Sequence, residues 1–92
     1  MSNQDPLQRL VGELVVLDTG TPVVYVGRMI AVDLHTFLLA DADMHDCRVG
    51  HATQEAYVAE ARRDGVSVNR REIVVMRHTV ISVSRLSDVV VE

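Results

Sequence analysis

The sequence lacks several residues and patterns that mark specialised protein classes. It has no Trp and no Lys, and its single cysteine, Cys47, cannot form a disulfide within the chain, which favours a reducing compartment. No apolar run approaches the roughly 20 residues that a membrane-spanning helix needs. Residues 1–5 are polar and lack the basic and apolar segments of a signal peptide. We therefore expect a cytoplasmic protein with no membrane partner.

The composition is that of an ordinary folded protein. Of the 92 residues, 48% are apolar and 24% are charged, which excludes a disordered chain and suits one domain over residues 1–92. The net charge of −4 argues against a general nucleic-acid coat. The segment 62–77 nevertheless carries a local charge of +3, from arginines 62, 63, 70, 71 and 77. A basic outer patch for RNA or phosphate is one interpretation, and ordinary solvated ion pairs are the commoner one.

Local signals predict a short helix, several strands and a second helix. Asp5 as N-cap, Pro6 and a capping-box Gln8 indicate an N-terminal helix of about two turns that stops at Gly12. Runs of Val, Leu and Ile between turn residues predict strands. The expected strands cover residues 13–18, 23–32, 36–43, 72–77 and 80–86, with a short terminal pairing at 89–91. A glycine inside the second strand, Gly27, costs stability unless the sheet bends sharply or another backbone comes close.

The periodicity of the residue pattern changes from strand-like to helix-like between residues 53 and 64, where an inserted helix is predicted. Thr53 is its N-cap, Arg62 and Arg63 lie in its last turn, and Gly65 follows. Tyr57 is expected to anchor this helix onto the sheet. The link at 78–79 is short, so the last two strands meet in a tight hairpin or form one bent run. The pattern favours a mainly β fold, a small, strongly bent, five-stranded antiparallel sheet or barrel, with helices at the N-terminus and between strands 3 and 4.

Two stretches resemble the motifs of the Sm-like (LSm) family. Gly27, Met29 and Asp33 match the first motif, and an apolar strand follows Phe37, which stands where the family has Asn. A second stretch, residues 76–78, matches the Arg of the Ile-Arg-Gly motif. The segment from about 44 to 70 would then be an expanded variable loop.

The resemblance implies a homo-oligomeric ring of about five to eight subunits, closed by pairing of the fourth strand with the fifth strand of the next chain. It also implies single-stranded RNA at the pore. His35 would stack on a base, Asp33 would support it, and Arg77 would close the pocket. His78 adds a second imidazole where the motif has Gly, whereas Phe37 cannot supply the amide that reads a base edge. Purely architectural roles are the alternative: Asp33 capping its turn, Arg77 pairing with it, and His35 exposed to solvent.

The sequence is also compatible with functions other than RNA binding. A ring acting as a protein-interaction scaffold without nucleic acid suits the acidic charge, and a monomeric or dimeric barrel is also compatible. No nucleophile, base and orienting group stand out, so we expect no enzyme and no cofactor.

The segment 41–51 contains residue types that bind metal ions. Alternation along a strand would place four metal-binding residue types on one face, with His51 folding back. The four are Asp41, Asp43, His45 and Cys47. Their spacing matches no structural zinc pattern, so no metal is expected.

Overall fold

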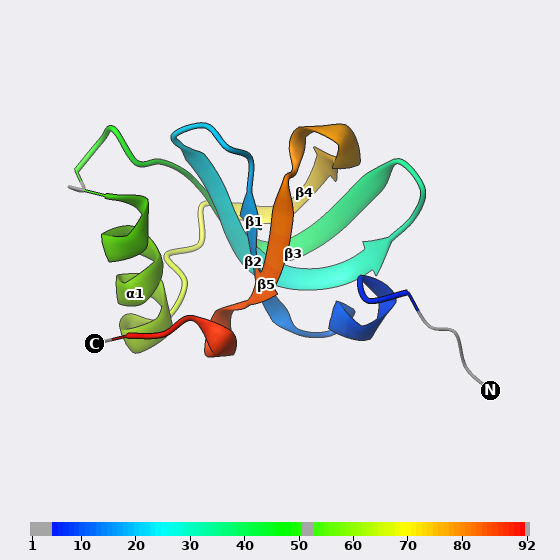
Figure 1. Ribbon diagram of the computed structural model, residues 1–92, viewed down its shortest axis with the longest axis horizontal. Coiled ribbons are helices and arrows are strands. Elements are labelled where there is room, and N and C mark those ends of the chain that lie inside the picture. The colour runs from blue at the N-terminus through cyan, green and yellow to red at the C-terminus, as the bar shows by residue number, and fades with distance from the viewer. Residues whose placement is uncertain (1–4, 51–52, 92) are drawn as a thin grey trace.

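The computed structural model describes residues 5–50 and 53–91 and contains one bent antiparallel sheet with an α-helix at one end (Figure 1). The strands follow the order β4-β3-β2-β1-β5 across the sheet. Their bounds are β1 (Leu14–Asp18), β2 (Val23–Val32), β3 (Thr36–Asp46), β4 (Arg70–Met76) and β5 (Ser82–Arg85). The helices are η1 (Gln8–Leu10), α1 (Gln54–Asp64), η2 (Arg77–Thr79) and η3 (Leu86–Asp88), of which only α1 is an α-helix.

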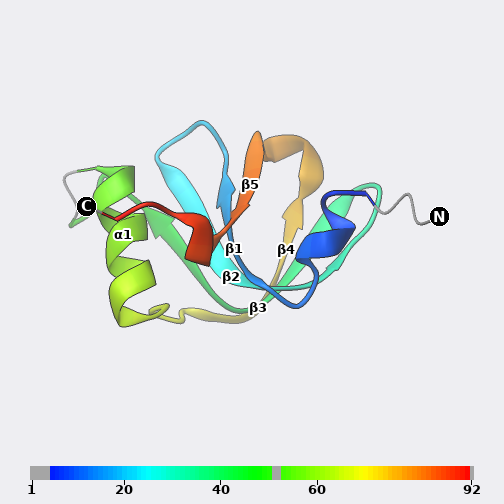
Figure 2. The same ribbon diagram turned by 60° about the horizontal axis from the view of Figure 1, so that its bottom comes forward.

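The predicted mainly β architecture with five antiparallel strands is confirmed. Figures 1 and 2 show β2 and β3 curving through the middle of the sheet, with η1 at one end and α1 at the other. The inserted helix lies between β3 and β4, as expected, and it begins at the predicted cap. The hydroxyl of Thr53 accepts a hydrogen bond from the amide of Ala56 at 3.0 Å.

The N-terminal helix is shorter than predicted, a single 3-10 turn over Gln8–Leu10. The Asp5 carboxylate accepts a hydrogen bond from the amide of Leu7 at 2.8 Å. The capping box does not form, because the Gln8 side chain donates instead to the carbonyl of Val32 at 3.1 Å. This tertiary hydrogen bond ties the turn to the end of β2.

The connection after β4 also differs from the prediction. η2 turns the chain so that β4 and β5 lie on opposite edges of the sheet, and β5 pairs with β1. Of the two predicted alternatives, the tight hairpin is therefore wrong, and the chain runs with a bend from β4 through η2 into β5. The terminal strand at 89–91 is wrong as well, since the described residues there form no strand and the Val89 carbonyl accepts from Arg62.

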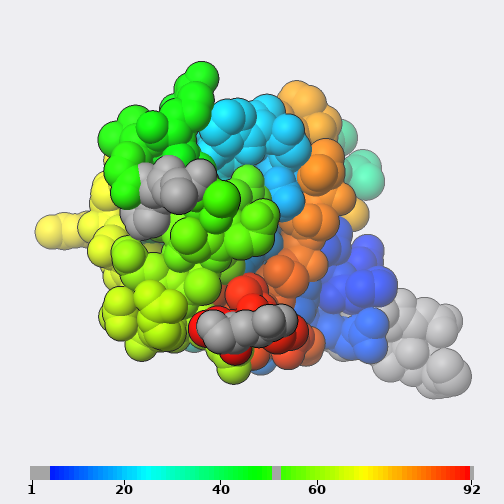
Figure 3. Space-filling view, turned by 60° about the vertical axis from the view of Figure 1, so that its left-hand side comes forward, coloured from blue at the N-terminus to red at the C-terminus, as the bar shows by residue number. Residues whose placement is uncertain are grey.

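The apolar core forms two clusters on opposite faces of β1. The first fills the inside of the bent sheet and takes Val15 and Leu17 from β1. The second lies between the sheet, α1 and η3, and takes Val16. Both faces are covered, so β1 is a continuous apolar run rather than an alternating one. Figure 3 shows the covering layer, with α1 and the C-terminal segment side by side over this end of the sheet.

Gly27 lies where the backbones of β2 and β3 approach closely. A Cβ atom at this position would lie 2.7 Å from the Cβ of Ala42. The β2–β3 register shifts next to Gly27, between Val26 and Arg28. The extra β3 residue at this shift is Asp41, whose φ is +49°. The prediction that Gly27 marks a bend or a close backbone approach is confirmed.

Candidate nucleic-acid interface

Two turns that are distant in sequence meet at one place on the surface. The amide of Arg77 in η2 donates to the carbonyl of His35 in the β2–β3 turn at 2.8 Å. The Arg77 guanidinium also donates to the carbonyl of Asp33 at 2.7 Å, across 44 residues of sequence. These bonds bring together Asp33, His35, Arg77 and His78, four of the predicted site residues.

Asp33 builds the β2–β3 turn with its carboxylate. One oxygen, Oδ1, accepts from the amides of His35 and Thr36 at 2.8 and 2.7 Å and from the Thr36 hydroxyl at 3.0 Å. The hydrogen bonds from the His35 and Thr36 backbone and then from the Thr36 hydroxyl hold the pKa of the Asp33 carboxyl below its usual value. Asp33 thus caps its own turn, as the architectural interpretation expects. Arg77 bonds to its backbone carbonyl.

Phe37 lies beneath the surface rather than on it. Its side chain is 2% exposed and belongs to the core cluster inside the sheet. The Arg77 guanidinium carbon lies 6.0 Å from the centre of the Phe37 ring, at the outer limit of a cation–π contact. The Phe37 ring therefore lies in the core below Arg77, outside the lining of the cavity between the two turns.

The exposed part of the site is a shallow cavity of about 320 Å³ where the two turns meet. It is lined by Leu34, His35, Met76, Arg77 and His78. Both imidazoles are exposed, and Leu34 and Met76 are 77% and 47% exposed. Flat rings, apolar side chains and a guanidinium are the groups that hold stacked bases and phosphates of single strands. Sequence reasoning missed Leu34 and Met76, although an apolar side chain in an Asp-initiated turn was a signal for the first.

Comparison with known proteins identifies the fold. No protein-family model and no curated protein matches the sequence. Among solved structures, the chain is similar to the Sm protein of Pyrococcus abyssii, determined in complex with a uridine heptamer, at 24% identity and a TM-score of 0.60. The match covers 89% of this chain and 99% of that one. The chain has an Sm-like fold. The resemblance predicted from Gly27, Asp33 and Arg77 is confirmed at the level of the fold.

The strand alternation on which the possible metal site depends is not kept in the structure. The bulge at Asp41 breaks the alternation, leaving Asp41 exposed while Asp43 is buried against Tyr57. Across residues 5–50 and 53–91, no three His, Cys, Asp or Glu side chains gather as metal ligands would. His51 lies outside the described residues. Burial raises the pKa of the Cys47 thiol, and the negative charges of Asp46, Glu55 and Asp43 raise it further. A higher pKa leaves less of the thiolate form, which is the form that binds a metal.

Two of the arginines around α1 donate hydrogen bonds to backbone carbonyls. Arg62 donates to the carbonyl of Val89, and Arg70 donates to the carbonyl of Asn69 at 3.0 Å. In the part of the chain that the structure describes, no helix has the length and apolarity to cross a membrane.

Proposed function

We propose that this Sm-like chain assembles into a homo-oligomeric ring that binds single-stranded RNA where the β2–β3 turn meets η2. The observation that carries this proposal is the joining of the two turns by Arg77. It places two exposed imidazoles, His35 and His78, beside a guanidinium in one cavity. The Sm protein of similar fold holds a uridine heptamer, which supports RNA as the ligand class.

The two edges of the sheet support assembly into a ring, for which the family resemblance implies about five to eight subunits. β4 and β5 each have one neighbour in the sheet and lie at opposite ends of its order. Exposed apolar side chains accompany both edges: Val74 is 57% and Met76 47% exposed on β4, and Ile81 is 70% exposed before β5. An unpaired apolar edge promotes aggregation, whereas head-to-tail pairing of β4 with β5 of the next chain removes it. A cytoplasmic location remains part of this proposal.

The lining of the cavity favours binding with little base preference. It contains no side-chain amide that could both donate to and accept from a base edge. Stacking on imidazoles and charge attraction to phosphate are tolerant of base identity. Oligo-U and oligo-A are therefore expected to bind with similar affinity.

The test is fluorescence anisotropy of labelled oligo-U and oligo-A with the wild type and Arg77→Ala. Removal of the guanidinium is expected to weaken binding by about tenfold, the effect of losing a phosphate or stacking contact worth ~1–3 kcal/mol. Arg63→Ala, an exposed arginine on α1, is the matched control and leaves affinity unchanged. Unchanged affinity for Arg77→Ala, with native mass spectrometry showing an intact ring in both variants, would remove Arg77 from the site.

A protein-interaction scaffold without nucleic acid is the second candidate, favoured by the net charge of −4. The ratio of absorbance at 260 and 280 nm separates the two candidates. The chain has no Trp and two Tyr, so RNA that copurifies without nuclease treatment raises the ratio strongly. A protein free of nucleic acid that also ignores both oligonucleotides would favour the scaffold.

A further inference from the structure

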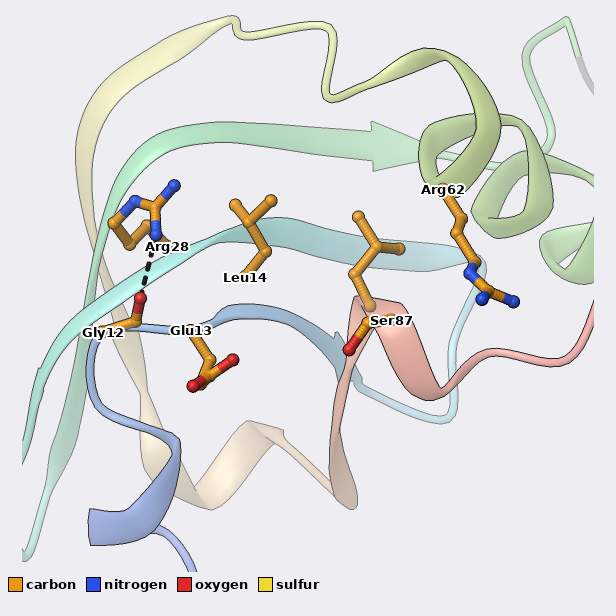
Figure 4. Close-up of a pocket in the computed structure, with 7 residues that line it drawn as sticks. Gly12, Glu13, Leu14, Arg28, Arg62 and Ser87 are labelled. Carbon is orange, nitrogen blue, oxygen red and sulfur yellow. Dashed lines mark hydrogen bonds between the residues drawn. The ribbon is translucent and has the colours of Figure 1, made fainter.

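A larger cavity lies away from the two turns, at the end of the sheet that α1 covers. Its volume is about 380 Å³, and residues of the segment before β1, of β1, β2, α1 and η3 line it (Figure 4). The lining residues are Gly12, Glu13, Leu14, Arg28, Arg62, Leu86 and Ser87. None of them belongs to the proposed RNA site.

The cavity has an apolar middle and a cation at each end. Leu14 and Leu86 line the cavity and form its aliphatic floor. Leu14 is half-buried, and Leu86 is 5% exposed. Figure 4 shows Arg28 and Arg62 at opposite ends of this floor, with Leu14 and Ser87 between them. The arginines come from β2 and α1, and both are exposed.

Backbone contacts orient both guanidinium groups without neutralising them. Arg28 donates to the carbonyl of Gly12 at 2.9 Å, and Arg62 donates to the carbonyl of Val89. A guanidinium has five N–H donors, and a neutral carbonyl leaves its positive charge in place. Each arginine lines the cavity and keeps further N–H donors for an anion.

The acidic side chain in the lining, Glu13, lies near a third arginine, Arg85. Glu13 lies 3.8 Å from Arg85, which also lies 3.6 Å from Asp88. Arg85 is not among the lining residues. The lining itself carries two arginines, Arg28 and Arg62, against one glutamate, and so has an excess of positive charge.

We propose that this cavity binds a short acidic segment of a partner protein, with aliphatic residues between two carboxylates. Paired arginines suit carboxylates, which accept two N–H bonds from one guanidinium. The aliphatic floor suits Leu or Val side chains between them. RNA is the less favoured ligand because no aromatic ring or imidazole lines the cavity for a base to stack on.

The probe is a fluorescein-labelled peptide, Glu-Leu-Val-Leu-Glu with its C-terminus amidated, and the control probe has Gln at both ends. Wild-type protein is expected to bind the Glu peptide saturably and the Gln peptide at least about fivefold more weakly, the effect of about one exposed ion pair. Arg28→Gln and Arg62→Gln each reduce affinity for the Glu peptide by about fivefold. Arg63→Gln, which removes the adjacent charge on α1 outside the cavity, leaves it unchanged.

Three outcomes would overturn the assignment. The wild type could show no saturable binding of the Glu peptide, or it could bind the Glu and Gln peptides equally. Alternatively, Arg28→Gln, Arg62→Gln and Arg63→Gln could all bind the Glu peptide with the same affinity. Weaker oligonucleotide binding by Arg28→Gln or Arg62→Gln, with no effect on peptide binding, would assign the cavity to RNA instead. Arg28→Lys and Arg62→Lys keep the charge, and partial recovery of peptide affinity shows that charge rather than folding is measured. Because Arg77 lies outside the cavity, Arg77→Ala leaves peptide binding intact and separates this test from that of the RNA site.

Discussion

Asp43 is a buried carboxylate that joins three parts of the protein. It is 5% exposed, and it accepts hydrogen bonds from the hydroxyl of Tyr57 on α1 and from the side-chain amide nitrogen, Nδ2, of Asn69 at 2.8 Å. Asn69, in the linker before β4, also accepts from the amide of Met44 at 3.0 Å. The His45 ring stacks on Tyr57 with centroids 4.1 Å apart. A buried charge with two donors is retained at low cost, whereas the loss of either donor leaves it undersatisfied.

Tyr57 is expected to make stability depend on pH in the alkaline range. Burial, and then the hydrogen bond to Asp43, raise the pKa of its hydroxyl above the usual value of about 10. Below pH ~10 both folded and unfolded chains keep the proton; above it only the unfolded chain loses it, so stability falls by up to ~1.4 kcal/mol per pH unit. Urea denaturation at pH 8 and pH 11 tests this. Tyr57→Phe is less stable at pH 8 but loses less than the wild type on going to pH 11, and an equal loss in both would refute the assignment.

Single residues were predictable from sequence where their role is local. Asp33 capping its own turn and Tyr57 on the buried side of α1 follow from spacing alone. The part played by Asn69 did not, because its partners lie 25 and 26 residues away. The burial of Phe37 was also missed, since a motif position does not tell how exposed its side chain is.

Secondary-structure elements follow the same division between local and distant causes. α1 was predicted almost to the residue because its cap and terminal charges are short-range signals. β3 extends three residues beyond the prediction, to Asp46, because the bulge at Asp41 restores its pairing with β2. The N-terminal helix was overestimated because Gln8 bonds to Val32 instead of its own helix end.

The N-cap of α1 makes a measurable contribution to stability. Thr53→Ala removes the acceptor for the Ala56 amide and is expected to lower the free energy of unfolding by ~1 kcal/mol. Chemical denaturation followed by circular dichroism measures the change. Thr53→Ser keeps the hydroxyl and stays within about 0.5 kcal/mol of the wild type. An alanine variant as stable as the serine variant would show that tertiary packing alone positions the helix.

At the scale of the whole molecule, the sheet order determines which surfaces can join copies of the chain. The pattern of apolar runs and turn residues predicted a mainly β fold, and the strand order is compatible with a head-to-tail assembly because the two edges of the sheet differ. Composition could not predict the second core cluster, because covering the outer face of β1 depends on where an inserted helix folds back.

Val74 on the β4 edge is expected to be needed for assembly but not for folding. It is 57% exposed in the single chain, so Val74→Asp changes the free energy of unfolding by less than about 0.5 kcal/mol. In the proposed ring the same carboxylate would be placed in a strand–strand contact. Sedimentation velocity is expected to show smaller species for Val74→Asp. Val49→Asp, at a 67% exposed valine in the β3–α1 loop, leaves the sedimentation coefficient unchanged, and equal behaviour of the two variants would exclude the β4 edge from the contact.

The two-sided burial of β1 has a consequence for how its alignment is specified. In most strands, sliding by one residue exposes the apolar face, and that penalty selects the alignment. In β1 a slide would exchange Val16 for Val15 or Leu17, one aliphatic side chain for another. The selection must therefore come from the ends. Asp18 accepts from the amide of Gly20 at 2.8 Å at one end, and Gly12 donates to the Met29 carbonyl at 2.7 Å at the other. The residues flanking β1 therefore set its register, and the aliphatic residues within the strand contribute little to that choice.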